Sequence, residues 1–187
     1  LNQGVSHSPR PRYAGHGEGG SARPFGLKWK YFLGDGATST PAFADGKVVV
    51  CTESGMIHVV EGATGHKAWG RRIAAGSGAG FVFSSPLIRD GRIYVGAKDH
   101  HLYCVDLRSG EVHWAHDAGK EIYAAPKGDA RGIVFSTADG HVICLDPQSG
   151  ERRWRFQADR EIGAAAAIWG QQLLIPGRDR TMYRIDY

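Results

Sequence analysis

Short apolar runs alternate with polar turns along most of the chain from Leu27 onward. β-Branched and aromatic residues concentrate in these runs, a composition typical of strands rather than helices. The runs at 48–50, 93–95 and 133–135 are apolar at consecutive positions. A strand exposed to solvent on one face would alternate apolar and polar residues, so we expect these strands to be covered on both faces by neighbouring sheets. The pattern therefore predicts an all-β fold of stacked sheets.

These runs belong to a repeat. In successive blocks a Pro and a Trp are separated by the same interval, with an acid and a Thr-Gly or Ser-Gly pair between them. The blocks run from Pro41 to Trp69, Pro86 to Trp114 and Pro126 to Trp154, and a further block starts at Ala166 and reaches Tyr187 without the Gly or Trp. Self-similarity with a period of about 40–45 residues is typical of a β-propeller built from four-stranded antiparallel blades.

Each repeat predicts four strands, A to D. We expect a lone D strand at 27–32, ABCD sets at 38–71, 83–116 and 123–156, and an ABC set at 163–187, so that residues 25–187 form the propeller repeats. Residues 1–24 lack apolar spacing and are rich in Gly, Pro and Ser, which predicts a flexible linker or arm. A Gly-rich insertion at 74–80 is interpreted as a flexible loop suited to partner binding.

About four repeats are present, and three arrangements are open. The chain closes as a complete small ring if its first D strand pairs with its last C strand. Alternatively, two chains form one dimeric ring. In the third arrangement the chain is the C-terminal part of a larger propeller, with about seven or eight blades, whose upstream blades are missing.

The Gly before each D strand and the Trp within it are predicted to hold the blades together. Gly adopts a left-handed turn without the steric cost of a Cβ atom. The large indole is expected to pack between blades and to donate its N–H to a backbone carbonyl. The residues assigned this structural docking role are Trp29, Trp69, Trp114, Trp154, Gly65, Gly110 and Gly150.

Charge and composition exclude several function classes. The 187 residues carry a net charge of +4 without a dense basic stripe, so we expect no nucleic-acid partner. No run reaches the ~18 apolar residues of a transmembrane helix.

Cys104 and Cys144 occupy the same position of successive repeats and are predicted to be buried thiols. Neither metal-ligand spacing nor a Ser-His-Asp or Cys-His arrangement is found, so we assign no catalytic and no metal-binding residue.

The segments 84–96 and 102–114, which read SSPLIRDGRIYVG and LYCVDLRSGEVHW, resemble the PQQ-like (quinoprotein) β-propeller repeat, and the Gly-to-Trp segment resembles the tryptophan-docking motif of that family. The resemblance implies a propeller and several classes of function. Quinoprotein alcohol dehydrogenases bind pyrroloquinoline quinone and calcium, whereas BamB-like members are non-catalytic scaffolds in outer-membrane protein assembly. Other members are sensor domains fused to kinases or adenylate-forming enzymes.

The sequence departs from the dehydrogenases of this family. It is far shorter, it lacks their adjacent cysteine pair, and it shows no set of acidic and amide side chains for calcium, which takes about six or more oxygens. We therefore expect no enzymatic activity and no cofactor, with pyrroloquinoline quinone and calcium retained only under the alternative of a quinoprotein fragment.

The sequence favours a non-catalytic interaction or scaffold module that docks a protein partner through one loop face, where the least repeated residues lie. The predicted binding residues are Glu53, Lys98, Asp99, His100, Glu121, Arg178, Asp179 and Arg180. The alternatives are a cofactor-binding fragment of a PQQ-dependent oxidoreductase and a sensor or accessory domain fused to a kinase or adenylate-forming enzyme. By family analogy we expect the bacterial cell envelope or periplasm, with the cytoplasm as the alternative.

Overall fold

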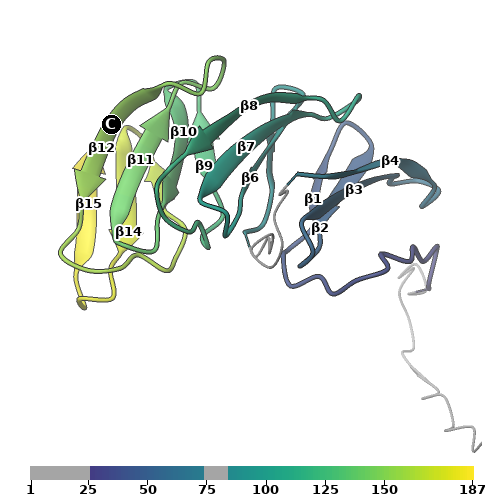
Figure 1. Cartoon of the computed structure of the whole chain (residues 1–187), viewed down its shortest axis with the longest axis horizontal. Coiled ribbons are helices and arrows are strands. Elements are labelled where there is room, and N and C mark those ends of the chain that lie inside the picture. The colour runs from purple at the N-terminus through teal and green to yellow at the C-terminus, as the bar shows by residue number, and fades with distance from the viewer. Residues whose placement is uncertain (1–25, 74–83) are drawn as a thin grey trace, which may run out of the picture.

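The computed structural model describes residues 26–73 and 84–187, so the predicted arm at 1–24 and the insertion at 74–80 lie outside the described residues. Within the described ranges the regular secondary structure is entirely β, which confirms the predicted fold class. The strands form successive antiparallel sheets, or blades, arranged side by side along an arc (Figure 1). No helix long and apolar enough to cross a membrane occurs in this part of the chain.

The blades follow one another in sequence order. Blade 1 contains β1 (Ala42–Ala44), β2 (Lys47–Cys51), β3 (Met56–Glu61) and β4 (Lys67–Arg72). Blade 2 contains β5 (Leu87–Arg89), β6 (Arg92–Gly96), β7 (His101–Asp106) and β8 (Val112–Asp117). Blade 3 contains β9 (Lys127–Asp129), β10 (Gly132–Ser136), β11 (His141–Leu145) and β12 (Arg152–Gln157). Blade 4 contains only β13 (Ala167–Trp169), β14 (Gln172–Pro176) and β15 (Met182–Asp186).

Tight turns join the first two strands of blades 1 and 2. Asp45-Gly46 and Asp90-Gly91 are two-residue hairpin loops in which all φ angles are positive, between 49° and 74°. This is the geometry that Asp-Gly pairs favour, because both residues tolerate the left-handed region.

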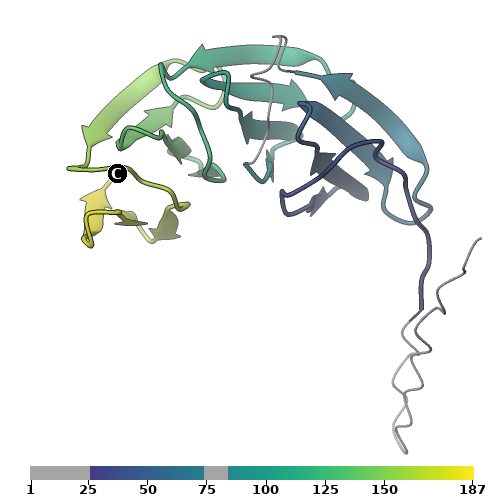
Figure 2. The same cartoon turned by 60° about the horizontal axis from the view of Figure 1, so that its bottom comes forward.

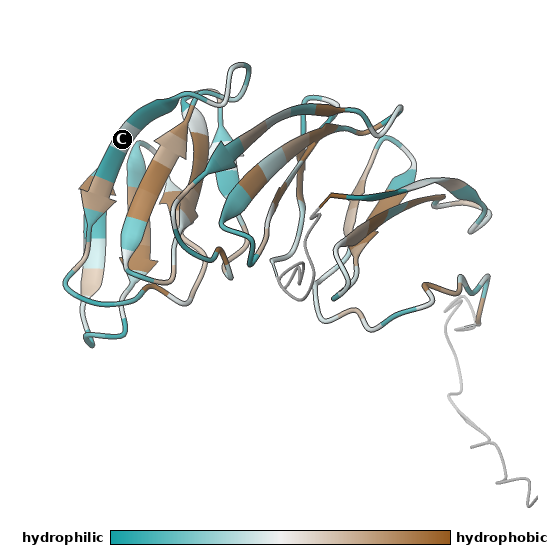
Figure 3. Ribbon diagram, in the orientation of Figure 1, coloured by the Kyte–Doolittle hydropathy of each residue, from teal (hydrophilic) through white to brown (hydrophobic). Residues whose placement is uncertain are grey.

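The hydrophobic core is divided into layers between adjacent blades. Ile93 and Val95 pack in the layer shared with blade 1, whereas Tyr94 of the same strand packs in the layer shared with blade 3. Consecutive residues of a strand point to opposite faces, so a strand with a core on each side is apolar throughout. Figure 3 shows this as brown, apolar middle strands such as β11 beside the polar outer strand β12. The predicted double burial is therefore confirmed.

The short first strands β1, β5, β9 and β13 are neighbours along the concave side, and the outer strands β4, β8 and β12 follow the convex side (Figure 2). The arc stays open, and blades 1 and 4 lie at its two ends (Figure 2). β15 pairs with β14 alone among the described strands. Residues 27–32, predicted as strand D, are not a strand because no described strand lies beside them to pair with.

Candidate functional site: the loop face

The predicted docking residues form one recurring contact between blades. The Trp69 indole nitrogen on β4 donates to the Leu107 carbonyl of blade 2 at 2.9 Å. Its ring covers Gly110, where φ is 75° and a Cβ atom would lie 3.0 Å from the ring. Only Gly provides both the left-handed turn and the space for the indole. The contact therefore links the outer strand of one blade to the turn of the next.

Two other indoles make the same contact. Trp114 on β8 donates to the Pro147 carbonyl at 3.3 Å and covers Gly150 of blade 3. Trp29 donates to the Gly62 carbonyl at 2.9 Å and covers Gly65 of blade 1. The Trp29 segment thus holds the place of an outer strand that precedes blade 1.

Trp154 on β12 is placed differently. Blade 4 provides no Gly for its ring, and the edge of Trp154 instead meets Tyr187, with ring centroids 6.3 Å apart. Among the described residues its indole nitrogen has no carbonyl partner comparable to Leu107 or Pro147.

At the end of the blades opposite to the Trp–Gly contacts, backbone hydrogen bonds join the turn between strands B and C to the segment that leads into the same blade in blades 1, 3 and 4. Glu53 N–H donates to the Gly36 carbonyl at 2.8 Å, Ala138 N–H to Glu121 at 2.9 Å, and Arg178 N–H to Glu161 at 3.0 Å. These bonds recur at the same position of the repeat. They fix a loop face whose backbone is regular and whose side chains vary, which is where specificity is expected.

Two of the predicted binding residues, Asp99 and Asp179, accept hydrogen bonds within their own turns. Asp99 Oδ1 accepts the His101 N–H at 3.2 Å, and its Oδ2 accepts the Tyr103 hydroxyl at 2.6 Å. Asp179 Oδ1 accepts the Thr181 N–H at 2.9 Å, and its Oδ2 accepts the Tyr183 hydroxyl. The Tyr183 hydrogen bond is the main cause of a lowered pKa at Asp179. Both carboxylates are therefore engaged in shaping the loop face.

His100 and Arg180 occupy strained backbone positions. Their φ angles are 74° and 68°, whereas the equivalent residues of blades 1 and 3 are Gly55 and Gly140, with φ angles of 83° and 90°. A side chain in this region costs about 1–2 kcal/mol. Strain kept at a loop where Gly fits equally well points to a role for the side chain itself.

The loop face is hollowed between blades 3 and 4. The hollow has a volume of about 550 Å³ and is lined by Glu121, Tyr123, Ala138, Glu161, Ile162, Gly163 and Arg178. Arg178 Nη1 bridges Glu161 Oε2 at 2.9 Å, and both side chains are more than half exposed. Lys98 Nζ lies 5.8 Å from the centre of the Tyr123 ring, which is itself 39% exposed. An aromatic side chain thus stands beside charges of both signs.

Of the predicted binding residues, the structure brings Glu121 and Arg178 together in this hollow. Lys98 lies next to the hollow, because its ammonium group is over the ring of the lining residue Tyr123. Glu53 lies away from it in blade 1. Sequence reasoning did not select Tyr123 or Glu161. The repeat could have identified Glu161, because it occupies the same position of its repeat as Glu121 and both carbonyls accept the same backbone bond.

A second charged hollow, of about 880 Å³, lies at the opposite end of blades 1 and 2. Three of its charged groups already have partners: Lys47 Nζ lies 2.6 Å from Glu61, Arg92 donates to the Pro147 carbonyl at 2.8 Å, and Asp106 accepts two turn N–H groups. These bonds support the blades, so the loop face is the better candidate for binding.

The described residues contain no group of three or more His, Cys, Asp or Glu side chains that could hold a metal ion. Cys51, Cys104 and Cys144 are separate and buried, and burial raises the pKa of the Cys51 thiol to about 12 and of the other two to about 11. They are packing residues in the blades, as predicted for Cys104 and Cys144.

A family model described as outer membrane protein assembly factor BamB matches residues 26–125 and 102–187. The outer membrane protein assembly factor BamB of Yersinia pestis is 30% identical over 104 residues, which is 50% of this chain and 26% of that protein. The quinohemoprotein alcohol dehydrogenase of Comamonas testosteroni is 27% identical over 102 residues, which is 50% of this chain and 14% of that protein.

Among solved structures, BamB from Moraxella catarrhalis superposes with a TM-score of 0.75 at 22% identity, over 85% of this chain and 49% of that one. This likeness shows the propeller fold. The chain spans about half of that structure, and its alignments cover 26% and 14% of the two curated relatives.

Proposed function

The chain belongs to the PQQ-like repeat family whose model carries the BamB description, and on that premise we propose that it is a non-catalytic scaffold module that docks a protein partner through its loop face. The single observation that carries the proposal is the hollow where Glu121, Tyr123, Glu161 and Arg178 meet. Relatives that are named assembly factors support an interaction role, whereas those named dehydrogenases support the alternative.

The chemistry of the hollow suits a polypeptide. Tyr123 offers a half-exposed ring with a cation beside it, and aromatic residues of this kind are common anchors in interfaces. The exposed Arg178–Glu161 pair presents both charges at the rim, where exposed ion pairs contribute little stability and exchange readily with partner groups. His100 and Arg180 add polar side chains held in place by a strained backbone.

Site-specific photo-crosslinking tests this proposal. A photoreactive amino acid at Tyr123 should capture one defined polypeptide in cells that express the chain, and Arg178→Ala should reduce the capture. The same group at Val112, which is 38% exposed on β8, is the matched control and should not capture that polypeptide. Equal capture from both positions would refute docking through the loop face.

The quinoprotein alternative is favoured by the relatives named alcohol dehydrogenases. It predicts that the chain retains a chromophore when it is mixed with pyrroloquinoline quinone and calcium and then passed through a desalting column. We expect no retained absorbance. A bound chromophore at one molecule per chain would replace the scaffold proposal with that of a cofactor-binding fragment.

We propose the bacterial cell envelope as the location, with the cytoplasm as the alternative, because the family model and several relatives are named for outer membrane protein assembly. Fractionation of cells that express the full-length natural protein should recover it with the envelope. Recovery in the cytoplasmic fraction alone would refute this location.

A further inference from the structure

The junctions between neighbouring blades differ in one contact near the turns between strands C and D. Arg92, at the start of β6 in blade 2, reaches across to blade 3, where it donates to the Pro147 carbonyl at 2.8 Å and to Gln148 Oε1 at 2.6 Å. Arg131 of blade 3 likewise donates to the Tyr187 carbonyl of blade 4 at 3.3 Å. Pro147 and Tyr187 each directly follow the acid of their repeat, so the two arginines bond equivalent carbonyls.

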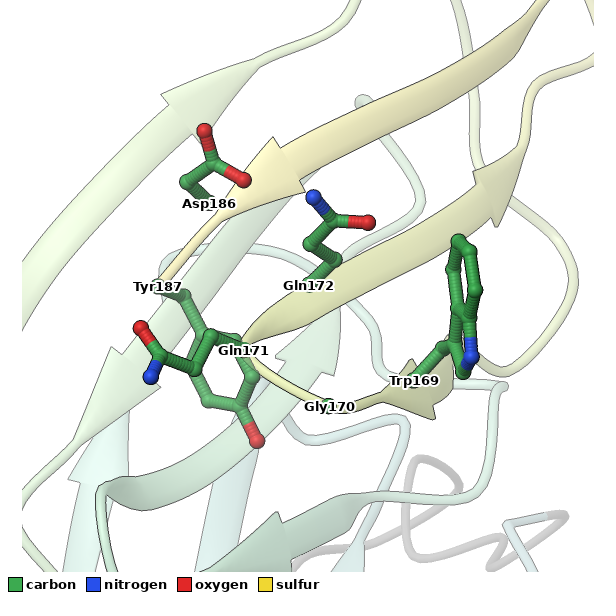
Figure 4. A pocket seen from close by; sticks show the side chains of 6 residues that line it. All are labelled: Trp169, Gly170, Gln171, Gln172, Asp186 and Tyr187. Atoms are coloured by element: carbon green, nitrogen blue, oxygen red, sulfur yellow. The ribbon is translucent and has the colours of Figure 1, made fainter.

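Figure 4 shows the place in blade 4 that Arg131 reaches. Gly170, in the turn between β13 and β14, and Tyr187, just after β15, lie at the same end of the blade. The Arg131 guanidinium donates to the carbonyl of each. A guanidinium carries five N–H donors in one plane, so a single arginine can bond several acceptors at once. An arginine of one blade thus ties down the turns of the next blade.

The junction between blades 1 and 2 lacks this arginine contact. Lys47 holds the equivalent position in β2, and its ammonium group lies 2.6 Å from Glu61 of its own blade. The equivalent carbonyl in blade 2 is that of Leu107, which accepts the Trp69 indole N–H at 2.9 Å. Among the described residues no arginine or lysine donates to it. The hollow of about 880 Å³ lies at this junction.

The hollow is formed by the sides of blades 1 and 2 that face each other. Between blades 2 and 3 the same place is filled by Tyr94, whose hydroxyl donates to the Pro147 carbonyl at 3.3 Å. The smaller Val49 holds the position of Tyr94 in β2, and it belongs to the core layer between blades 1 and 2. The hollow is therefore a property of this junction and not of either end of the arc.

Cations line this hollow from both blades. Lys47 comes from blade 1, and Arg92, Arg108 and His113 come from blade 2. Between blades 2 and 3 the arginine meets the neutral amide of Gln148, but Arg108 stands at the equivalent position in blade 2. Lys47 and Arg108 are both donors without acceptor atoms in their charged groups, so they cannot bond each other. An anion between them would accept hydrogen bonds from both blades.

Three carboxylates also line the hollow, and two of them are engaged. Asp90 is in an ion pair at 3.1 Å. Asp106 Oδ1 accepts two turn N–H groups, and its Oδ2 lies 3.6 Å from His113 Nε2. The third, Asp45, is exposed in its hairpin turn. The guanidinium of Arg108 is exposed and has no hydrogen-bond or ion-pair partner within the part of the chain that the structure describes.

We propose that the hollow between blades 1 and 2 binds a phosphate-type oxyanion, either free or as the terminal group of a larger molecule. Its oxygens accept from Arg108 of blade 2 and from Lys47 of blade 1, whose ammonium has two further N–H donors besides the one directed at Glu61. A tetrahedral anion suits cations that come from two sides, and arginine and lysine are its common ligands in proteins. The anion joins the two blades as Arg92 joins blades 2 and 3.

This site is separate from the proposed docking surface. The hollow lies at the end of the blades opposite to the loop face, and it shares no lining residue with the hollow between blades 3 and 4. Anion binding and partner docking therefore succeed or fail separately.

Titration of the intact chain with inorganic phosphate gives the first test, followed by amide chemical shifts in a buffer without other oxyanions. Saturable shifts should appear at 45–47 and 107–110, the segments on the two sides of the hollow. Glycerol phosphate is the second probe. Tighter binding of glycerol phosphate than of inorganic phosphate identifies the group as part of a larger molecule, whereas equal or weaker binding identifies the free anion. The absence of saturable shifts with both probes would overturn the proposal.

Arg108→Gln places the amide of Gln148 in blade 2 and should weaken phosphate binding about tenfold or more, because it removes a hydrogen bond between charged groups. Arg155→Gln on β12 is the matched control, since it makes the same change at an exposed position outside the hollow. It should bind phosphate as the parent chain does. Equal weakening by the two variants would show a general attraction of the chain for anions and would refute the site.

Lys47→Arg combined with Arg108→Gln gives the third test, because the pair rebuilds the contact of blades 2 and 3 at the first junction. The introduced guanidinium can bond the introduced amide and the Leu107 carbonyl, as Arg92 does in the next junction. Phosphate should raise the Tm of the parent chain, as any ligand of the folded state does, but should leave the Tm of the double variant unchanged. A double variant that responds to phosphate as the parent chain does would contradict binding between Lys47 and Arg108.

Discussion

At the scale of the residue, the indole–glycine contact is the feature that recurs most regularly. Trp69 and Trp114 each bond a carbonyl of the next blade and each cover a Gly whose φ angle is close to 75°. The sequence predicted both residue types from spacing alone, because the large apolar ring and the left-handed turn recur in the repeat. It could not predict that Trp154 meets Tyr187 instead, because Tyr187 lies outside the repeated Gly-to-Trp segment.

Trp114→Ala should destabilise the protein by about 3 kcal/mol, toward the lower end for large-to-small substitutions because the ring is only half buried. The change removes the bond to the Pro147 carbonyl and the contact with the Tyr94 ring at 5.8 Å. Urea unfolding measures the loss. Trp169→Ala, whose side chain is 65% exposed, is the control and should cost less than about 1 kcal/mol.

Gly150→Ala separates the indole contact from backbone strain. A Cβ atom there would lie 2.6 Å from the Trp114 ring, whereas Gly91, at a similar φ of 71°, has nothing within 4 Å. Both alanine variants bear the left-handed cost of about 1–2 kcal/mol. Gly150→Ala should lose at least about 1 kcal/mol more, since overpacking adds its own cost. Equal losses in thermal unfolding would contradict a clamp at Gly150.

His100→Gly and Arg180→Gly should raise or preserve stability and weaken partner capture. Relief of left-handed strain contributes about 1 kcal/mol, which the greater freedom of Gly in the unfolded chain partly offsets. Differential scanning calorimetry measures the stability, and crosslinking at Tyr123 measures the capture. A large loss of stability would show that these side chains support the fold rather than a partner.

The carboxylate of Asp146 makes the free energy of unfolding depend on pH. Its Oδ1 accepts the Ser149 and Gln148 N–H groups, and Arg153 bridges its Oδ2 at 2.6 Å, which together hold its pKa at about 2. The ordinary value is about 3.9. A carboxylate with a lowered pKa stabilises the fold fully above about pH 4, and this contribution is lost as the pH falls toward 2.

The measurement is the free energy of unfolding between pH 2 and 6 for the parent chain and for Asp146→Asn. The variant should show a weaker decline on acidification. Asp45→Asn, in a turn that Asn also tolerates, is the control and should follow the parent chain. Parallel curves for all three proteins would rule out this role of Asp146.

At the scale of the element, burial on both faces determined which strands could be recognised. β10 is buried along its whole length, and the apolar run at 133–135 made it evident in the sequence. The candidate site was harder to predict. Lys98 and Tyr123 come from different segments, and their proximity depends on how far one loop reaches over the next blade. Residues 27–32 have a strand-like sequence, but a strand also requires a neighbour to pair with, and no described segment provides one.

At the scale of the whole molecule, each blade contacts only its neighbours along the arc. The stability of such an array is approximately a sum over blades and their shared layers, as in other repeat proteins. Blade 3 has a core on both sides, whereas blade 4 has one on a single side.

Amide hydrogen exchange should reflect this difference in core packing between blades 3 and 4. Amides of β10 and β11 should exchange most slowly, and those of β15, which alternates between exposed and half-buried residues, should exchange fastest among the strands. Uniform exchange across the blades would indicate a single cooperative unit instead.

The three buried cysteines have a consequence for following the blades in solution. Cys51, Cys104 and Cys144 lie on β2, β7 and β11, so each of the first three blades holds one thiol. Burial raises the pKa of each thiol, and an alkylating reagent reacts with the thiolate only when it becomes accessible. The rate at which each cysteine is labelled would therefore report how often its own blade opens.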